Sequence, residues 1–77
     1  MSDRVSEVAA AIVRYLEEHP NAADTEDGIR SGWLGSGRAG AAEVSGALEL
    51  LIRAGSVERM QIGTRVLFRA HRARGQH

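Results

Sequence analysis

The sequence predicts a small α+β domain in which three helices precede a C-terminal β-hairpin. Apolar residues recur at helical spacing in two segments, residues 5–16 and 41–52, and a short capped segment lies between them. From Ser56 onward the apolar residues instead alternate on both sides of a Gly-Thr pair, as in a hairpin. A chain of 77 residues is long enough for one core, so we expect a single domain over residues 1–70 and a basic, disordered tail over residues 71–77.

The first helix is indicated by a set of apolar residues that share one helical face: Val5, Val8, Ala9, Ile12, Val13 and Leu16. Ser2 or Asp3 can cap its start, because a side-chain oxygen at that position accepts a hydrogen bond from a free N–H of the first turn. Pro20 lacks an N–H and disfavours helical geometry in the residue before it. The helix is therefore expected to end near His19.

A second, shorter helix is expected after Asp24 or Thr25, either of which can act as its N-cap. Its buried side consists of Ile29, Trp33 and Leu34. Trp33, the only tryptophan, has two interpretations: an aromatic anchor for a partner, or a core residue. The spacing of four residues from Ile29 favours the core, because both side chains then lie on the same helical face.

The third helix is predicted from a second set of apolar residues at the same spacing: Ala41, Val44, Ala47, Leu48, Leu51 and Ile52. Gly55 follows at the position where glycine commonly ends a helix.

The stretch SVERMQIGTRVLFRA predicts the hairpin, with Gly63 and Thr64 as a type II′ turn because that turn has glycine at its first central position. The expected cross-strand pairs are Ile62 with Arg65, Met60 with Leu67, and Glu58 with Arg69. The alternation assigns Val57, Val66 and Phe68 to the face that closes the core, and Met60, Ile62 and Leu67 to a more exposed face.

The segment GSGRAG, residues 35–40, matches the glycine pattern of a dinucleotide-binding loop. That chemistry needs a buried strand before the loop, whereas the residues before Gly35 have the charges and capping pattern of a helix. The segment is therefore interpreted as a bend between the second and third helices.

The order helix, helix, Gly-rich turn, helix, hairpin, and above all the stretch ALELLIRAGSVERMQIGTRVLFRA, resembles the winged-helix superfamily. In that family a third helix ending in glycine leads into a strand, a wing turn and a strand that carries an aromatic residue. The stretch HPNAADTEDGIRSGWL is similar to a motif of small bacterial winged-helix-like proteins. The resemblance implies a three-helix winged helix-turn-helix, and it leaves the activity open because its residue motifs are generic.

The composition excludes several kinds of catalytic and metal site. There is no cysteine, which removes disulfides, thiolate metal sites and thiol catalysis. His19, His71 and His77 are too scattered along the chain for a metal site, and no serine has a histidine placed to activate it. We expect no enzyme activity, no metal, no cofactor and no small-molecule substrate.

The chain is expected to be cytoplasmic and to have no membrane partner. It contains no run of about 18 apolar residues. Its first ten residues, MSDRVSEVAA, carry acids where a signal peptide has a basic region followed by an apolar one.

The charges are unevenly distributed although the formal net charge is zero. From Met1 to Ile52, four arginines stand against nine acids, a net charge of −5, whereas from Arg53 to His77 six arginines stand against Glu58 alone, a net charge of +5. A basic segment of this kind contacts phosphates, meets an acidic protein, or is simply a solvated surface.

The exposed face of the third helix distinguishes two hypotheses for function. A DNA-reading winged helix offers polar and basic side chains to base edges there, whereas this face carries Ala42, Gly46, Glu49, Leu50 and Arg53. We therefore predict a protein-docking adaptor, or a self-associating protein, that uses these five residues together with Met60, Ile62 and Leu67 of the wing. A solvated surface of no function is the simplest alternative interpretation of this face.

The second hypothesis is a DNA-binding transcriptional regulator that contacts phosphates without reading bases. Its candidate contacts are Ser36, Arg38, Arg59, Arg65, Arg69, Arg72 and Arg74.

Overall fold

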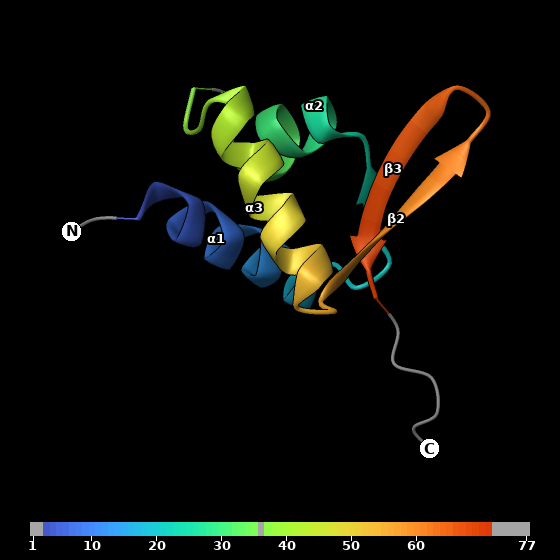
Figure 1. Cartoon of the computed structure of the whole chain (residues 1–77), viewed down its shortest axis with the longest axis horizontal. Coiled ribbons are helices and arrows are strands. Elements are labelled where there is room, and N and C mark those ends of the chain that lie inside the picture. Colours follow the sequence, from blue (N-terminus) through green and yellow to red (C-terminus); the bar gives the residue numbers. More distant parts are fainter. Residues whose placement is uncertain (1–2, 36, 72–77) are drawn as a thin grey trace, which may run out of the picture.

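Three helical segments pack together, and a β-hairpin extends away from them in the computed structural model, which describes residues 3–35 and 37–71 (Figure 1). In chain order the elements are α1 (Arg4–Glu18), β1 (Ala23–Asp24), α2 (Glu26–Gly28), η1 (Ile29–Trp33), α3 (Ala41–Arg53), β2 (Val57–Ile62) and β3 (Arg65–Ala70). The α+β class and the order of the predicted elements are confirmed. Of the predicted tail, only His71 lies within the described residues.

The first helix begins and ends for the reasons that the sequence gives. The Asp3 carboxylate accepts a hydrogen bond from the Ser6 N–H at 3.3 Å, so Asp3 is the N-cap. The last helical residue is Glu18, two residues before Pro20.

The second helix is a short α-helical turn that widens into the π-helical turn η1. Its N-cap is Thr25, whose Oγ1 accepts a hydrogen bond from the Gly28 N–H at 3.1 Å. The Leu34 N–H then donates to the carbonyl of Ile29 at 3.1 Å, a span of five residues that defines the π geometry. The wide turn keeps Ile29 fully buried against the other helices.

Strands β2 and β3 form the predicted hairpin in the predicted register, with Ile62 opposite Arg65 and Met60 opposite Leu67. Gly63, the first central residue of the turn, has a φ of 63°, whereas Thr64 does not have a positive φ, because every described residue with a positive φ is a glycine. A positive φ at the first central residue alone is what a type II′ turn requires. The strand β1 was not predicted; it pairs antiparallel with β3 and makes a three-stranded sheet in the order β1-β3-β2.

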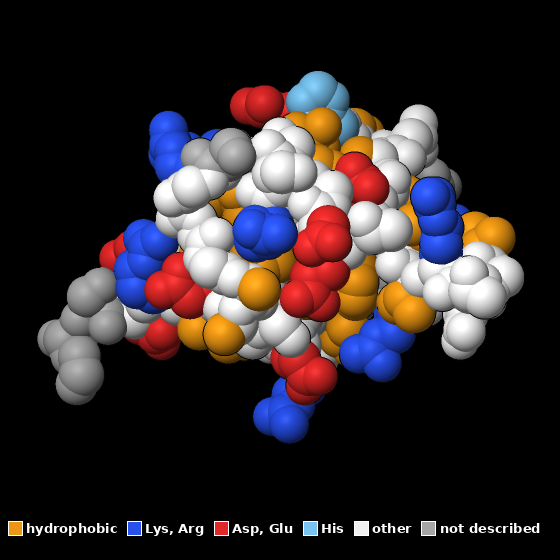
Figure 2. All heavy atoms as spheres, turned by 90° about the horizontal axis from the view of Figure 1, so that it is seen from above, with side chains coloured by type: hydrophobic (Ala, Val, Ile, Leu, Met, Phe, Trp, Pro, Cys, Tyr) orange, Lys and Arg blue, Asp and Glu red, His pale blue; other side chains and the backbone are white. Residues whose placement is uncertain are grey.

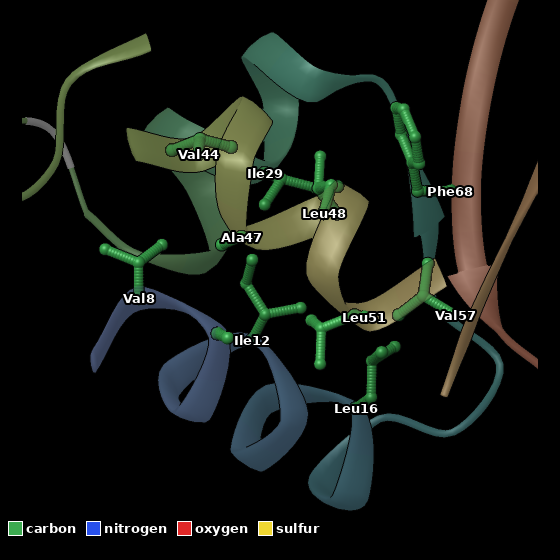
Figure 3. Packing of buried hydrophobic residues seen from close by; sticks show 11 residues of the cluster. Val8, Ile12, Leu16, Ile29, Val44, Ala47, Leu48, Leu51, Val57 and Phe68 are labelled. Carbon is green, nitrogen blue, oxygen red and sulfur yellow. The ribbon is translucent and has the colours of Figure 1, made fainter. Parts of the chain in front are cut away.

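The core lies where α1, η1, α3 and the base of the hairpin meet (Figure 3). Ile12 of α1 and Leu48 of α3 point into it, and Phe68 closes it from the hairpin side. The buried residues are Val8, Ala9, Ile12, Leu16, Ile29, Val44, Ala47, Leu48, Leu51, Val57 and Phe68.

The prediction that Val66 closes the core is wrong, because 37% of its surface remains exposed. The hairpin extends beyond the helices, so only the part of this sheet face near Val57 and Phe68 meets the core. Val66 lies two residues nearer the turn and faces a groove instead.

The described part of the segment that resembles a nucleotide-binding loop, Gly35 and residues 37–40, lies in a turn, as predicted. Gly35 and Gly37 have φ values of 93° and 82°, which only glycine adopts without strain. Arg4 at the start of α1 holds this turn, because its Nη2 donates a hydrogen bond to the carbonyl of Arg38 at 2.7 Å. A helix and not a strand precedes the turn, so the dinucleotide-binding architecture is absent from the described residues.

Candidate functional site

The exposed side of α3 carries a shallow hollow of about 340 Å³ that brings together four of the five residues predicted there: Gly46, Glu49, Leu50 and Arg53. Positions three, four and seven apart lie on one face of a helix, which is why these four are neighbours. Leu50 is 43% exposed. Ala42 is also exposed and lies one turn before Gly46, but it does not line the hollow.

Gly46 is less accessible than the sequence suggests. It is half-buried, and a Cβ atom at this position would lie 3.4 Å from Cγ2 of Val5 in α1. The predicted exposed strip was centred on Gly46 as a solvent-facing small residue. This prediction is wrong at Gly46, because the residue lies in the contact between α1 and α3.

A second depression, which we name the α3–hairpin groove, has a volume of about 320 Å³. Leu48 and Phe68 contribute to its apolar lining, and the exposed part of Val66 forms its hairpin wall. Glu49 borders both the groove and the hollow on α3, so the two depressions meet at this residue. The full lining is Glu26, Ser45, Leu48, Glu49, Arg59, Val66 and Phe68.

The predicted hairpin strip of Met60, Ile62 and Leu67 does not join the α3 surface. Side chains alternate between the two faces of a strand, and Phe68 lies on the face that meets the helices. The strip therefore points away from α3, with Ile62 56% exposed and the other two side chains half-buried. The predicted partner surface is thus two separate surfaces on opposite sides of the sheet.

Two residues of the hairpin, Val66 and Arg59, line the groove beside α3, and sequence reasoning identified neither as a groove residue. The alternation correctly placed Val66 on the same face as Phe68. It carried no information on how far the helices extend along that face, so it could not separate a core residue from a groove residue.

Three charged side chains of the groove form no ion pair with another described residue. Neither Glu26 nor Glu49 on the helical side forms an ion pair within residues 3–35 and 37–71, and neither does Arg59 on the hairpin side. By contrast, Arg30 pairs with Asp27 at 3.3 Å. In the view from above, acidic side chains gather near the middle of the surface with hydrophobic side chains beside them (Figure 2).

The predicted phosphate contacts are dispersed. Arg59 lies in the groove, whereas Arg65 lies on the opposite face of the hairpin. Arg69 forms an ion pair with Glu58, and Arg38 lines a different hollow beside α1. Ser36, Arg72 and Arg74 lie outside the described residues.

Among the residues that the structure describes, no group of three or more histidine, aspartate or glutamate side chains is placed to hold a metal ion. No helix in the same part of the chain has the length and apolar character needed to cross a bilayer.

Comparisons of the chain with protein-family models, with curated proteins and with solved structures each found no match. Function is therefore inferred from the geometry of the α3 surface and from the chemistry of its lining residues.

Proposed function

We propose that the chain is a winged-helix protein-docking module whose α3–hairpin groove binds a segment of a partner protein. The segment presents an apolar side chain next to a lysine or arginine. The observation that carries the proposal is the groove itself, in which an apolar floor lies beside two carboxylates without ion-pair partners among the described residues.

The winged-helix assignment is supported by the arrangement of the elements. Three helical segments precede a hairpin, and the hairpin packs beside α3 through Val57 and Phe68. The strand β1, at the entrance to α2, pairs with β3 and so ties the hairpin to the helical part.

The apolar half of the groove favours a partner side chain over water. Val66 keeps 37% of its surface exposed next to the almost buried Leu48 and Phe68. Covering apolar surface of this kind gains about 25 cal/mol for each Å² removed from water. One inserted aliphatic or aromatic side chain would remove the remaining exposure of Val66.

The charged half of the groove favours a basic neighbour on the partner. Glu26 and Glu49 come from α2 and α3, and both line the same depression. A lysine or arginine there gains charge-assisted hydrogen bonds at a partly desolvated site. Arg59 on the opposite wall is available to a backbone carbonyl or a carboxylate of the same segment.

The same residues weigh against α3 as a base-reading helix. A helix in the major groove needs side chains that form hydrogen bonds with base edges, and it approaches phosphates closely. The exposed positions Ala42 and Leu50 offer no such group, and the carboxylate of Glu49 repels phosphates. Ser45 is the remaining polar neutral side chain that faces the groove.

The proposal is tested by panning a phage library of random peptides on the immobilised protein and titrating the enriched peptides by fluorescence anisotropy. We expect the enriched sequences to combine an apolar residue with lysine or arginine. Val66→Asp should weaken their binding at least about tenfold, or 1.4 kcal/mol. Ile62→Asp, an equally drastic change on the opposite face of the same hairpin, should not.

Failure to enrich peptides that combine an apolar residue with lysine or arginine would overturn the proposal, and so would peptides of that kind that bind Val66→Asp as tightly as the wild type. Thermal unfolding of both variants checks that the fold is retained. Both positions are exposed, so neither substitution introduces a charge into the core.

A sequence-independent DNA-binding regulator is the second candidate, favoured by Arg59 and Arg65. Both are exposed on the hairpin and neither forms an ion pair with another described residue. Such arginines contact phosphates and produce binding that weakens steeply with salt. Titration of a random duplex against the protein distinguishes this candidate, because a docking module should show no appreciable binding at physiological salt.

A further inference from the structure

Tyr15 of α1 and Trp33 of η1 form a stacked aromatic pair at the edge of the helical part. Their ring centroids are 4.7 Å apart and their planes differ by 9°. His19 also contacts Tyr15, with its ring centroid 4.4 Å from that of Tyr15 and its plane tilted by 33°. Both rings of the stack are half-buried, so part of their surface is open to solvent.

The open part of this stack borders a hollow of about 270 Å³ that we name the aromatic hollow. Leu34 contributes further apolar surface to it, and Arg14 and Arg38 lie at its margin. Tryptophan, tyrosine and arginine are the residue types that contribute most to binding energy at protein interfaces. Here all three types line one depression on a small domain.

The two arginines of the hollow have no ionic partner in the described part of the chain. Arg4 differs from them, because it pairs with Glu7 at 3.4 Å and with Glu43 at 3.5 Å. Arg4 also binds the backbone carbonyl of Arg38, which fixes the position of that residue beside the hollow. The lining thus carries two arginines against the single carboxylate of Glu18, which leaves a net positive charge next to the aromatic surface.

We propose that the aromatic hollow is a second docking site, which binds an acidic protein segment. An apolar side chain of the segment packs against Trp33 and Leu34, while its aspartate or glutamate side chains pair with Arg14 and Arg38. Arginine suits this role because its planar guanidinium forms two parallel hydrogen bonds with one carboxylate. Association is accelerated by the opposite charges, as for other electrostatically complementary surfaces.

A nucleic-acid strand fits the hollow less well than an acidic peptide. Aromatic rings and arginines also stack on and bind single strands. However, the carboxylate of Glu18 lines the same hollow, and it would face the closely spaced phosphates of a strand. A peptide avoids this repulsion, because the spacing of its acidic residues is free to vary.

This site is independent of the proposed groove, since the two depressions share no lining residue. The aromatic hollow selects acidic segments, whereas the α3–hairpin groove selects basic ones. A molecule with both sites would connect two partners of opposite charge.

The test uses Trp33, the only tryptophan of the chain, as a fluorescent reporter. The probes are an array of synthetic peptides in which acidic and apolar positions are varied, together with analogues that carry glutamine or lysine in place of the acidic residues. Peptides that bind are then titrated by calorimetry. We expect acidic peptides to change the Trp33 emission and their glutamine analogues to bind at least about tenfold more weakly, a difference of 1.4 kcal/mol.

Arg14→Glu and Arg38→Glu should each weaken acidic peptides by a similar factor, whereas Arg65→Glu, the same change on an exposed arginine of the hairpin, should not. Thermal unfolding checks that each variant folds. The proposal is overturned if no acidic peptide of the array binds, or if the lysine analogues bind equally well. It is also overturned if single-stranded oligothymidylate binds more tightly than the acidic peptides, which would assign the hollow to nucleic acid. None of these results bears on Val66→Asp, so the two proposals fail separately.

Discussion

Phe68 is the side chain through which the hairpin joins the hydrophobic core. It is 7% exposed and belongs to the same buried cluster as Ile29 and Leu48. Phe68→Ala removes most of that contact, and we expect the free energy of unfolding to fall by about 3–5 kcal/mol. Urea denaturation followed by circular dichroism measures the change. A loss below about 1 kcal/mol would mean that the site collapses around the missing ring or that the ring is not buried in solution.

At Gly46, in contrast to Phe68, we expect a substitution that stabilises the folded state. Glycine lowers helix stability by about 1 kcal/mol relative to alanine, and a Cβ at Gly46 would make an ordinary contact with Val5 at 3.4 Å. We therefore expect Gly46→Ala to raise the free energy of unfolding by about 0.5–1 kcal/mol. Gly55→Ala is the matched control and should destabilise, because Gly55 has a φ of 80°. A destabilised Gly46→Ala protein would show that Val5 has no room for a methyl group.

Glu43 gives the fold a defined pH dependence. The Gly40 N–H donates to its carboxylate at 3.1 Å, and this bond, followed by that from Arg4, holds the pKa of Glu43 below its ordinary value. Since the folded pKa is the lower one, the stabilisation is fully present above the ordinary carboxyl pKa and is lost as the pH falls through the lowered value.

Glu43→Gln tests this dependence, because glutamine keeps an oxygen for the Gly40 N–H but carries no charge. We expect the difference in unfolding free energy between wild type and variant to be largest near neutral pH and to vanish in acid. Denaturation curves across the acidic range measure it, and a difference that does not change with pH would contradict the assignment.

At the scale of elements, the N-cap of the second helix depends on one side chain. Thr25 supplies the only side-chain cap that the structure shows for the helical turn formed by α2. Thr25→Ala should cost about 1 kcal/mol, whereas Thr25→Ser keeps the hydroxyl and should cost little. Thermal unfolding of the two variants measures the difference, and equal stabilities would show that the hydrogen bond contributes nothing.

The elements that the sequence predicted correctly are those with a repeated signal. Four turns of α1 and three of α3 repeat their apolar positions often enough to define a period, and the hairpin has both alternation and a Gly-Thr turn. The strand β1 has two residues, too few for any alternation to appear. Its existence depends on the position of β3 in space, which is a property of the packed molecule and not of residues 23–24.

At the scale of the whole molecule, the separation of charge along the sequence persists after folding, because each ion pair among the described residues joins two groups of the same half of the sequence. The Glu58–Arg69 ion pair neutralises charge within the hairpin, while Arg59 and Arg65 remain unpaired among the described residues. If duplex DNA binds at low salt, we expect an Arg59→Ala and Arg65→Ala double variant to weaken all sequences equally. The slope of log affinity against log salt should flatten by roughly 2, about 0.9 for each lost contact. Anisotropy titrations at several salt concentrations measure it, and a strong preference for one duplex would contradict this mode.

The candidate surface was predictable where one element supplies it and not where two elements meet. Helical spacing alone brings Gly46, Glu49, Leu50 and Arg53 together. The groove depends on how α3 and the hairpin lie relative to each other. Val66 was therefore assigned to the core, and Ile62, although correctly placed on the exposed face of the hairpin, was wrongly joined to the α3 surface. The aromatic hollow likewise joins α1 to η1, and the spacing of Trp33 from Ile29 did not reveal that Tyr15 stacks on it.

The small strand β1 has a consequence for the order in which the chain folds. Pairing Ala23 with Arg69 closes a loop of about 45 residues, whose conformational entropy is costly to lose, whereas the turn of the hairpin spans two residues. The hairpin and the individual helices can therefore begin to form from nearby residues, and the β1–β3 pairing follows once the helices have docked. Because that pairing forms late, a substitution at Ala23 or Asp24 that weakens it should speed unfolding and leave the folding rate almost unchanged, although both residues lie outside the hydrophobic core.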